Sequence, residues 1–432
     1  MPRQVRSAHV RIRRHRRGYT HVPTSKSASN REVACAFVSL KATQLSGRTL
    51  HSDDTAVLLN AARSFGILAE QHGRSLRLGP DKFRLGLLVA ELYVGNSGTT
   101  ARLVCACACR KPRHALVHGD PRMHRRPALA LTVGLASLGA KVVHLARQGS
   151  MPTAIGPTCT LKNFAPPMLP MSESSQFVTS AVLASHGIAH KDAPIACGRL
   201  TSSRMYVAST VDIMGLFGMC AEGHAWKRYA HVPAAMDCEY PGITDTDMTS
   251  ASYPTALGSM GMGMWRMLCG SDHASQSDAT MADAMYSMGC AMWQCREGNA
   301  MWRAARHSPT PRLLCCSAPD GAMTALTVSL ALAGASDAVG VLSWRYKETD
   351  RVLAMALELR RMGVAADCGM GCMACLSCAL PWHGRADVST YRDHRIAMCC
   401  SLMHAAGCVV RTSGPQCVCK TYPDYLHECA GA

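Results

Sequence analysis

The sequence predicts an α/β protein built from six similar units that divide between two domains. Three observations support this: the length of the chain, its apolar content, and two series of helix-like segments that recur about every 70 to 80 residues. At 432 residues the chain is long for one domain. With 48% apolar and 17% charged residues it can bury a large core, so disorder is not expected.

Each segment of the first series is amphipathic and ends in a glycine. In the segment 350–362, for example, Val352, Met355 and Leu359 follow helical spacing before Gly363. A glycine there suits the left-handed position just after a helix, and a strand is expected to follow it. The five glycines are Gly66, Gly139, Gly218, Gly289 and Gly363.

Each segment of the second series begins with polar residues and continues into an apolar helix. The starts lie near Asn30, Gly98, Ser175, Ala251, Gly321 and His394. Two interleaved series with one period predict six units, each with two helices and intervening strands. The segment 239–247, which contains Pro and Asp, lies near the middle of the chain and is interpreted as a crossover between domains of three units each. Because helix N-termini favour anions, these polar starts are where chemistry is expected.

The composition of the chain bears on its partners. A formal net charge of +17 suits nucleic acid, an anionic membrane or small polyanionic substrates. No apolar run reaches the roughly 18 residues that would indicate a membrane span. Only 5% of residues are aromatic, which offers little stacking surface for a nucleic acid. We therefore expect neither a nucleic acid nor a membrane as partner.

Cysteine usage and the N-terminal residues bear on the compartment. The 23 cysteines are scattered and often lie in apolar stretches, which is typical of small buried side chains in a reducing compartment. The first 20 residues are Arg-rich and lack the apolar core of a secretory signal. The run 11–17 (RIRRHRR) fits either a basic first strand and turn or an organellar transit peptide. A cytoplasmic location is expected, and a plastid stays open.

Eight cations lie at or beside the starts of the units. They are Lys26, Arg31, Arg102, Arg122, Lys347, Arg351, Arg395 and Lys420. Each cluster alone also fits a helix cap with a solvated charged face. Gathered in one cleft, eight cations would repel one another unless polyanions filled it, which favours two small phosphorylated or carboxylated substrates. The Gly-rich segment 95–102 matches neither a P-loop nor a dinucleotide fingerprint.

Nine short stretches of the chain carry a resemblance to one family. They are SKSASNR, SDDT, LYVGNSGTTAR, GDPRMHRRP, SSQF, SASYP, WRYKETDR, YRDHRIAM and KTYPDY, in this order between residues 25 and 425. With these motifs the chain resembles the 5-enolpyruvylshikimate-3-phosphate synthase (3-phosphoshikimate 1-carboxyvinyltransferase) family over nearly its whole length.

The resemblance implies a fold and a reaction. The fold is a two-domain inside-out α/β barrel of six βαβαββ repeats. Residues 22–240 form the shikimate phosphate side, and 1–21 with 241–432 form the phosphoenolpyruvate side. The reaction transfers the enolpyruvyl group of phosphoenolpyruvate to the 5-hydroxyl of shikimate 3-phosphate and releases phosphate. It belongs to the shikimate pathway, which leads through chorismate to the aromatic amino acids. Neither a metal nor another cofactor is needed, and a monomer is expected.

The resemblance also implies roles for individual residues. Asp320 would accept the proton of the 5-hydroxyl, Glu348 would protonate the methylene carbon, and Lys26 would assist as a third catalytic group. Contacts with shikimate phosphate would come from Lys26, Ser27, Arg31, Ser174, Ser175, Gln176, Ser203, Tyr206 and Ser343. Contacts with phosphoenolpyruvate would come from Arg122, Arg351, Arg395 and Lys420, with the loop residues Asn96 and Gly98. Lys26, Gln176 and Lys347 would reach both substrates, and Asp320 would also contact bound substrate.

The chain departs from the family pattern at four positions. Thr24 replaces the usual Gly before Ser-Lys, and Ser343 replaces the usual Asn before Trp. Leu103 follows Arg102 where Pro is usual, and Arg392 replaces the usual small or amide residue before Asp-His-Arg. These changes bear on efficiency and inhibitor response more than on the class of reaction.

Other functions stay open from the sequence. A related transferase acting on a UDP-amino sugar would share the fold and phosphoenolpyruvate, but the set Ser174-Ser175-Gln176 with Lys347-Glu348 argues against it. The spacing of Cys368, Cys372, Cys375 and Cys378 fits either a metal or cluster site or a Cys-rich hairpin. A basic RNA-binding protein and an inactive relative are the remaining alternatives.

Overall fold

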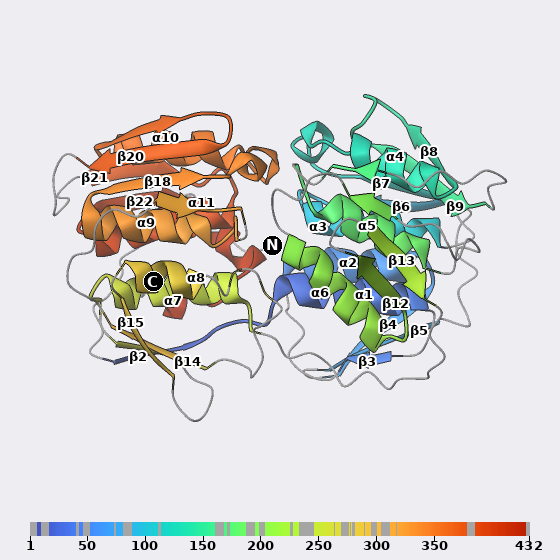
Figure 1. Ribbon diagram of the computed structural model, residues 1–432, viewed down its shortest axis with the longest axis horizontal. Coiled ribbons are helices and arrows are strands. Elements are labelled where there is room, and N and C mark those ends of the chain that lie inside the picture. Colours follow the sequence, from blue (N-terminus) through green and yellow to red (C-terminus); the bar gives the residue numbers. More distant parts are fainter. Residues whose placement is uncertain are drawn as a thin grey trace. The chain divides into compact units, whose positions relative to one another are not determined.

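A computed structural model gives the fold of the chain (Figure 1). It describes residues 7–9, 17–39, 43–45, 52–72, 75–80, 89–110, 114–159, 168–170, 173–186, 195–197, 204–224, 228–232, 246–262, 264–268, 276, 278, 281–288, 290–294, 300–303, 312–316, 318–377 and 385–428. The chain divides into a continuous unit, residues 24–244, and a discontinuous unit, residues 1–23 with 245–432. The sequence-based boundaries fall at 21/22 and 240/241.

The continuous unit contains three repeats. The first comprises α1 (Lys26–Ser39), β3 (Thr43–Leu45), α2 (Asp53–Ser64), β4 (Ile67–His72) and β5 (Ser75–Pro80). The second comprises β6 (Val89–Tyr93), α3 (Gly98–Cys109), β7 (His114–His118), α4 (Leu129–Ser137), β8 (Ala140–His144) and β9 (Thr153–Thr158). The third comprises β10 (Met168–Leu169), α5 (Gln176–Ser185), β11 (Ile195–Cys197), α6 (Arg204–Leu216), β12 (Cys220–His224) and β13 (Arg228–Val232).

The discontinuous unit contains the other three repeats. The fourth comprises β2 (Arg17–His21), α7 (Met248–Ser259), β14 (Met264–Leu268), α8 (Met281–Ser287), β15 (Ala291–Gln294) and β16 (Ala300–Arg303). The fifth comprises β17 (Arg312–Leu314), α9 (Ala322–Ala333), β18 (Ala335–Val339), α10 (Arg351–Arg361), β19 (Val364–Cys368) and β20 (Cys372–Ser377). The sixth comprises β21 (Arg385–Ser389), α11 (His394–Ala405), β22 (Val409–Ser413) and β1 (Ser7–His9), with α12 (Tyr425–Glu428) after it.

Four of the repeats, the second to the fifth, share one sheet topology. In the second repeat the strand order is β6-β7-β9-β8, with β6 and β7 parallel and the other neighbours antiparallel. The third and fifth repeats have the same order, β10-β11-β13-β12 and β17-β18-β20-β19. The fourth follows it too, because β2 pairs in parallel with β14 and takes the place of the first strand. Among the described residues the first and sixth repeats show three strands each, in the orders β3-β5-β4 and β1-β22-β21, so four of the six expected βαβαββ units show the full strand order.

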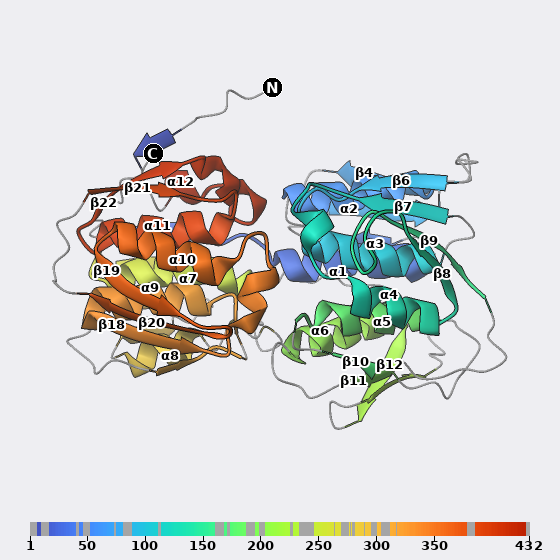
Figure 2. The ribbon, with the colours of Figure 1, turned by 90° about the horizontal axis from the view of Figure 1, so that it is seen from above.

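Helices lie inside each unit and sheets lie outside (Figure 2). The interior helices α1, α3 and α5 are buried along nearly their whole length, as are α7, α9 and α11. Helices without a solvent face are expected to be largely apolar, and α9 fits this, whereas α1 also buries Arg31 and Glu32. Strands such as β6 alternate exposed and buried residues, so one face of the sheet meets solvent. This inside-out α/β architecture confirms the predicted fold class.

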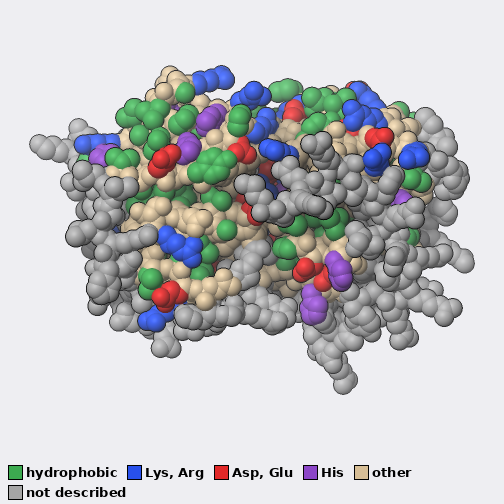
Figure 3. Space-filling view, turned by 180° about the vertical axis from the view of Figure 1, so that it is seen from behind, with side chains coloured by type: hydrophobic (Ala, Val, Ile, Leu, Met, Phe, Trp, Pro, Cys, Tyr) green, Lys and Arg blue, Asp and Glu red, His purple; other side chains and the backbone are tan. Residues whose placement is uncertain are grey.

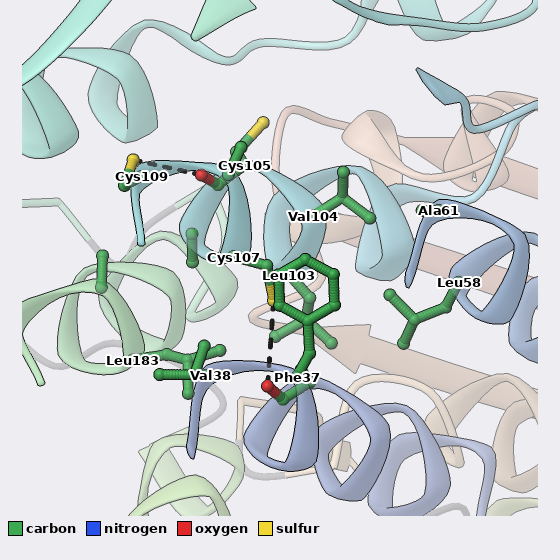
Figure 4. Packing of buried hydrophobic residues seen from close by; sticks show 14 of the residues in the cluster. Phe37, Val38, Leu58, Ala61, Leu103, Val104, Cys105, Cys107, Cys109 and Leu183 are labelled. Carbon is green, nitrogen blue, oxygen red and sulfur yellow. Dashed lines mark hydrogen bonds between the residues drawn. The ribbon is translucent and has the colours of Figure 1, made fainter. Parts of the chain in front are cut away.

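Cysteines fill part of the helical core of the continuous unit. Cys105, Cys107 and Cys109 lie on α3 among Phe37, Leu103 and other apolar side chains (Figure 4). Burial raises the pKa of the Cys105 thiol to about 12. These thiols therefore pack as small apolar groups, as the sequence indicates.

The helix ends follow the two predicted series. The interior helices begin within four residues of the six predicted starts. Backbone φ is positive at Gly66, Gly139, Gly218 and Gly363, and a strand follows each of them within two residues. Gly289 lies outside the described residues. Within the described chain no helix has the length and apolar character needed to cross a membrane.

Candidate functional site

Asp320 is the centre of a charged network in the discontinuous unit. It lies in the turn that leads into α9, after β17. Its Oδ1 is 3.3 Å from Lys347 Nζ and 3.0 Å from Arg351 Nη1, and its Oδ2 is 3.3 Å from Arg395 Nη2. The carboxylate thus meets three of the cations that the sequence places at unit starts.

The turn that carries Asp320 is held by two buried contacts. The backbone N–H of Gly321 donates to Oδ1 of Asp278 at 3.1 Å, and Asp278 Oδ2 accepts from Thr249. On the other side, Trp344 Nε1 donates to the carbonyl of Pro319 at 2.6 Å. The residues on either side of Asp320 in the chain are therefore fixed before any ligand binds.

Glu348 lies in the same network. Its Oε2 accepts from Arg351 Nη2 at 2.9 Å and its Oε1 accepts from Lys420 Nζ at 2.9 Å. Arg351 also donates to both oxygens of Asp393, and only 2% of its side chain is exposed. Arg351 therefore joins three carboxylates through one buried guanidinium group.

Electrostatics set the protonation states of this network. Burial raises the pKa of Asp320, but Arg395, Lys347 and Arg351 together lower it by more, so the net pKa lies well below its usual range. Burial lowers the pKa of Lys347, and Asp320 opposes this in part. Burial also lowers the pKa of Arg351, but the carboxylates of Asp393, Glu348 and Asp320 raise it above its ordinary value. At neutral pH Asp320 is therefore a carboxylate and Arg351 a cation.

Helix caps bring these side chains together. Asp350 caps α10 by accepting from the N–H of Leu353 at 3.1 Å, which puts Arg351 at the first helical position. Asp393 caps α11 by accepting from the N–H of Arg395 at 3.0 Å. Aspartate is a preferred residue at both places because its oxygens satisfy free N–H groups. Lys420 ends the 3₁₀ helix Pro415–Lys420.

Lys26 forms an ion pair in the continuous unit. It opens α1, and its Nζ is 3.1 Å from Oδ2 of the buried Asp54 on α2. Ser27 is the next residue of the same helix and is partly buried. The side chain of Lys26 is 12% exposed, so the ammonium group lies at the edge of the protein interior.

Arg31 is held by other parts of the continuous unit. Its guanidinium donates to Thr210 Oγ1 at 2.7 Å and to the carbonyls of Ser27 and Tyr206 at 2.8 and 3.1 Å. It also lies over the ring of Tyr206 on α6, 5.8 Å from the centroid. Burial lowers the pKa of Arg31 to about 10. These contacts join α1 to α6.

Two guanidinium groups pack against Gly98 at the start of α3. A Cβ added at Gly98 would lie 2.2 Å from Arg126 Nη2 and 2.3 Å from Arg102 Nη1. Arg126 Nη1 also donates to the carbonyl of Asn96 at 3.0 Å. Ser97 caps the helix by accepting from the N–H of Thr100. The backbone N–H groups of this loop thus lie beside two cations, which suits an anion.

The remaining residues that the sequence predicts for the site differ in how many contacts the structure describes for them. Gln176 opens α5 and donates through Nε2 to Thr99 Oγ1 at 2.9 Å, and its N–H donates to Ser174 Oγ. Ser175 is buried just before α5. Arg122 precedes the 3₁₀ helix Met123–Arg125 and is half-buried. Ser343 Oγ is buried and has no hydrogen-bond partner within the described part of the chain. Ser203 lies outside the described residues.

Of the eight predicted cations, four meet in one network and four belong to the continuous unit. The network also contains Asp393, which the sequence analysis does not assign to the site, and Lys26 is paired with Asp54, which it likewise misses. The signal for both was present, because each lies inside a motif that carries the resemblance, DHR and SDDT. Arg126 was a similar omission from GDPRMHRRP.

The cysteine spacing near residue 370 does not build a site among the residues described. Cys372 and Cys375 lie on one strand at odd spacing, so they face opposite sides, and Cys372 is exposed while Cys375 is buried. Cys378 lies outside the described residues. Across the described ranges no group of three or more metal-binding side chains is present.

Figure 3 shows the described charged side chains on one face of the molecule. Among the side chains described there, Lys and Arg are dispersed between acidic, hydrophobic and uncharged residues. The residues of the Asp320 network are instead buried or half-buried. Buried cations of this kind suit a small anion that can enter the site.

Comparison with known proteins gives one consistent result. A 3-phosphoshikimate 1-carboxyvinyltransferase from Cupriavidus taiwanensis is 34% identical over 429 residues, covering 96% of each chain. One from Paraburkholderia phytofirmans is 33% identical over 95% of each chain. Among solved structures, the fold is similar to an EPSP synthase from Acinetobacter baumannii, with a TM-score of 0.73, 17% identity and 98% coverage of both chains. It is also similar to the enolpyruvyl transferase NikO from Streptomyces tendae, with a TM-score of 0.71, 13% identity and coverage of 99% and 97%.

The match to the family itself spans almost the whole sequence. Residues 10–428 match the sequence model of EPSP synthase (3-phosphoshikimate 1-carboxyvinyltransferase). The matched range contains all six repeats, apart from β1, and every residue of the Asp320 network. With this match and the 34% identical relative, the chain belongs to the EPSP synthase family.

Proposed function

We propose that this chain transfers the enolpyruvyl group of phosphoenolpyruvate to the 5-hydroxyl of shikimate 3-phosphate and releases phosphate. Family membership supports the reaction. The observation that carries the assignment of roles is the Asp320 network, in which one ionised carboxylate lies within 3.3 Å of three cations. Such a group can accept a proton while the surrounding cations hold anionic substrate.

The reaction proceeds by addition and then elimination. Asp320 takes the proton of the 5-hydroxyl as the hydroxyl oxygen bonds to C2 of phosphoenolpyruvate. Glu348 acts in its protonated form, having taken up a proton when the substrates bind, and delivers this proton to C3. In the second step the C2–O bond to phosphate breaks, phosphate leaves, and the methyl group returns its proton to Glu348. The proton left on Asp320 is released with the products.

The cations divide the two substrates between them. Following the resemblance, Arg351, Arg395 and Lys420 hold the phosphate and carboxylate of phosphoenolpyruvate, and each lies beside Asp320 or Glu348. Arg122 and the loop of Asn96 and Gly98 act on the same substrate. Lys26, Ser27, Arg31, Ser174, Ser175, Ser203 and Tyr206 contact shikimate 3-phosphate, and Ser343 contributes a hydroxyl. Lys347 and Gln176 serve both substrates.

A phosphate-release assay tests this proposal. Purified protein is incubated with phosphoenolpyruvate and shikimate 3-phosphate, with each substrate omitted in turn, and with a UDP-amino sugar in place of shikimate 3-phosphate. Release that needs both phosphoenolpyruvate and shikimate 3-phosphate supports the proposal. Release only with the UDP-amino sugar, or with neither acceptor, contradicts it.

We also propose that the protein works as a monomer in the cytoplasm, with a plastid as the alternative compartment. The buried cysteines of both units suit a reducing environment. Light scattering after size-exclusion chromatography tests the first statement, and localisation of the tagged chain tests the second.

A further inference from the structure

An irregular turn leads from β21 into α11. Its two central residues, Tyr391 and Arg392, have φ of 54° and 57°, and neither is glycine. The turn closes with a hydrogen bond from the N–H of Asp393 to the carbonyl of Thr390 at 2.8 Å. Left-handed backbone is unfavourable for residues with a Cβ, so surrounding contacts must hold this turn in place.

The carboxylate of Glu358 makes two of those contacts. Glu358 lies on α10 and its side chain is fully buried. Its Oε1 accepts from the hydroxyl of Tyr391 at 2.6 Å, and its Oε2 accepts from the N–H of Ser389 at 3.2 Å. Ser389 is the last residue of β21, just before the turn, and Tyr391 is the first of its two central residues.

The end of the turn is held from the same helix. Arg351 lies seven residues before Glu358 on α10, which is about two helical turns, so the two side chains share one face. Arg351 binds both carboxylate oxygens of Asp393. Two side chains on one face of α10 therefore bind the turn: Glu358 through Ser389 and Tyr391, and Arg351 through Asp393.

This turn also sets the position of two charged groups of the network. Asp393 is the partner of Arg351, and Arg395 contacts Asp320 Oδ2 at 3.3 Å. A rotation of the left-handed residues would displace both. Small displacements of binding groups are costly in a site that depends on orientation.

We propose that Glu358 is a positioning residue: by accepting hydrogen bonds from Tyr391 and Ser389 it holds the left-handed turn that fixes Asp393 and Arg395 around Asp320. Glu358 itself touches no substrate. The inference rests on the proposed function for the identity of the site, but its structural part concerns only the turn and the Arg351–Asp393 contact.

The third partner of Glu358 supplies a matched control. Arg361 Nη1 lies 3.1 Å from both carboxylate oxygens, and 52% of its side chain is exposed. It contacts the same carboxylate but not the turn in any bond described. Tyr391→Phe removes a contact between Glu358 and the turn, and Arg361→Gln removes a contact of Glu358 that leaves the turn untouched.

Steady-state kinetics of these variants test the proposal. Tyr391→Phe is expected to raise KM for phosphoenolpyruvate about three- to tenfold. The substitution removes the hydrogen bond from Tyr391 to the charged Glu358, which holds the turn that positions Arg395. The KM for shikimate 3-phosphate is expected to change by less than about twofold, as are both constants in Arg361→Gln. An unchanged KM for phosphoenolpyruvate in Tyr391→Phe, or an equal rise in Arg361→Gln, overturns the proposal.

A rescue experiment separates positioning from simple loss of stability. Arg392→Asn in the Tyr391→Phe background eases the left-handed conformation, because Asn tolerates it better than Arg. The double variant is expected to recover at least about half of the lost affinity for phosphoenolpyruvate. No recovery in the double variant overturns the proposal. Glu358→Gln, if it folds, is expected to behave like Tyr391→Phe.

Crystal structures keep the test independent of the proposed function. If wild-type protein releases no phosphate from the two substrates, the proposed function fails, and the turn is then judged by structure alone. Tyr391→Phe is expected to change φ at residues 391 and 392 and to lengthen the 2.7 Å contact between Arg351 Nε and Asp393 Oδ2. An unaltered turn with that contact intact overturns the proposal.

Discussion

Arg351 and Asp393 are joined by two hydrogen bonds, from Nε to Oδ2 at 2.7 Å and from Nη2 to Oδ1 at 3.2 Å. The carboxylate of Asp393 is fully buried and the guanidinium nearly so. A planar guanidinium can satisfy both oxygens of one carboxylate and still reach two others, which an ammonium group cannot do. The pair therefore connects the cap of α11 to the carboxylates of Asp320 and Glu348.

Arg351→Lys should disable the network. Lysine cannot replace three separate contacts, so buried carboxylates lose their partner, which costs about 3 kcal/mol of unfolding free energy. Turnover should fall at least about a hundredfold. Urea unfolding and phosphate release measure the two effects. Arg345→Lys is the control: Arg345 pairs with Asp350 at 2.7 Å but lies outside the network. Equal effects of the two substitutions would contradict the role given to Arg351.

Asp320→Asn should remove an acid-sensitive part of the stability. The cations hold the pKa of Asp320 below its ordinary value of 3.8 in the folded protein. A carboxyl group whose pKa is lowered by folding stabilises the protein at pH values above its pKa in the unfolded chain. This stabilisation is lost as the pH falls through the pKa of the group in the folded protein. The free energy of unfolding of the wild type should thus exceed that of Asp320→Asn most at neutral pH, and the two values should approach each other below about pH 4. Denaturant unfolding from acid to neutral pH measures it, and a pH-independent difference would refute the ionised state of Asp320.

The same substitution should strongly impair catalysis at neutral pH. An amide cannot accept the hydroxyl proton, so kcat should fall about 10²- to 10⁴-fold. The KM values should change less, because Asn occupies nearly the same volume. A variant with wild-type kcat would remove Asp320 from its proposed role.

Gly98→Ala should displace the guanidinium groups at the start of α3. The new methyl group would lie within 2.3 Å of both Arg126 and Arg102, so the two side chains must move. We expect a rise of about tenfold in KM for phosphoenolpyruvate and a longer Arg126–Asn96 contact in a crystal structure. Gly215→Ala on α6 is the control, since nothing lies within 4 Å of its added Cβ. That change should stabilise the helix by about 0.5–1 kcal/mol and leave KM unaltered. Unchanged KM in Gly98→Ala would show that these cations do not act on this substrate.

Arg392→Asn should stabilise the protein. Arg392 has φ of 57°, and a left-handed residue with a Cβ costs about 1 kcal/mol, which Asn reduces. Thermal unfolding should show a higher Tm. Arg385→Asn, in the extended strand β21, should show no such gain because Asn is disfavoured in strands. A lower Tm for Arg392→Asn would mean that contacts of the arginine outweigh the strain.

Periodic features were predictable from the sequence because they depend on local patterns. The glycines that follow α2, α4, α6 and α10 predict where these helices end, and the apolar runs predict the interior helices. The left-handed turn was visible only indirectly. The family usually has a small or amide residue where this chain has Arg392, and the positive φ now explains that preference.

Long-range pairings were not predictable in the same way. The family resemblance implies that residues 1–21 belong to the second domain, but nothing local in the sequence indicates that β1 pairs with β22 or β2 with β14. In the site, the two carboxylates proposed as catalytic and four cations follow from motifs. The counter-charges Asp54 and Asp393 and the support from Glu358 depend on which helix faces are neighbours, and spacing along one chain does not show that.

The pairing of β2 with β14 has a consequence for synthesis on the ribosome. Residues 24–244 form a continuous unit, so all of their partners exist once residue 244 has emerged. Strand β2 is made earlier but must wait for residues 264–268, and β1 must wait for residues 409–413. Contacts so distant in sequence are slow to form. The nascent chain should therefore fold the continuous unit, residues 24–244, first. It should complete the Asp320 network last, after Lys420 has left the exit tunnel.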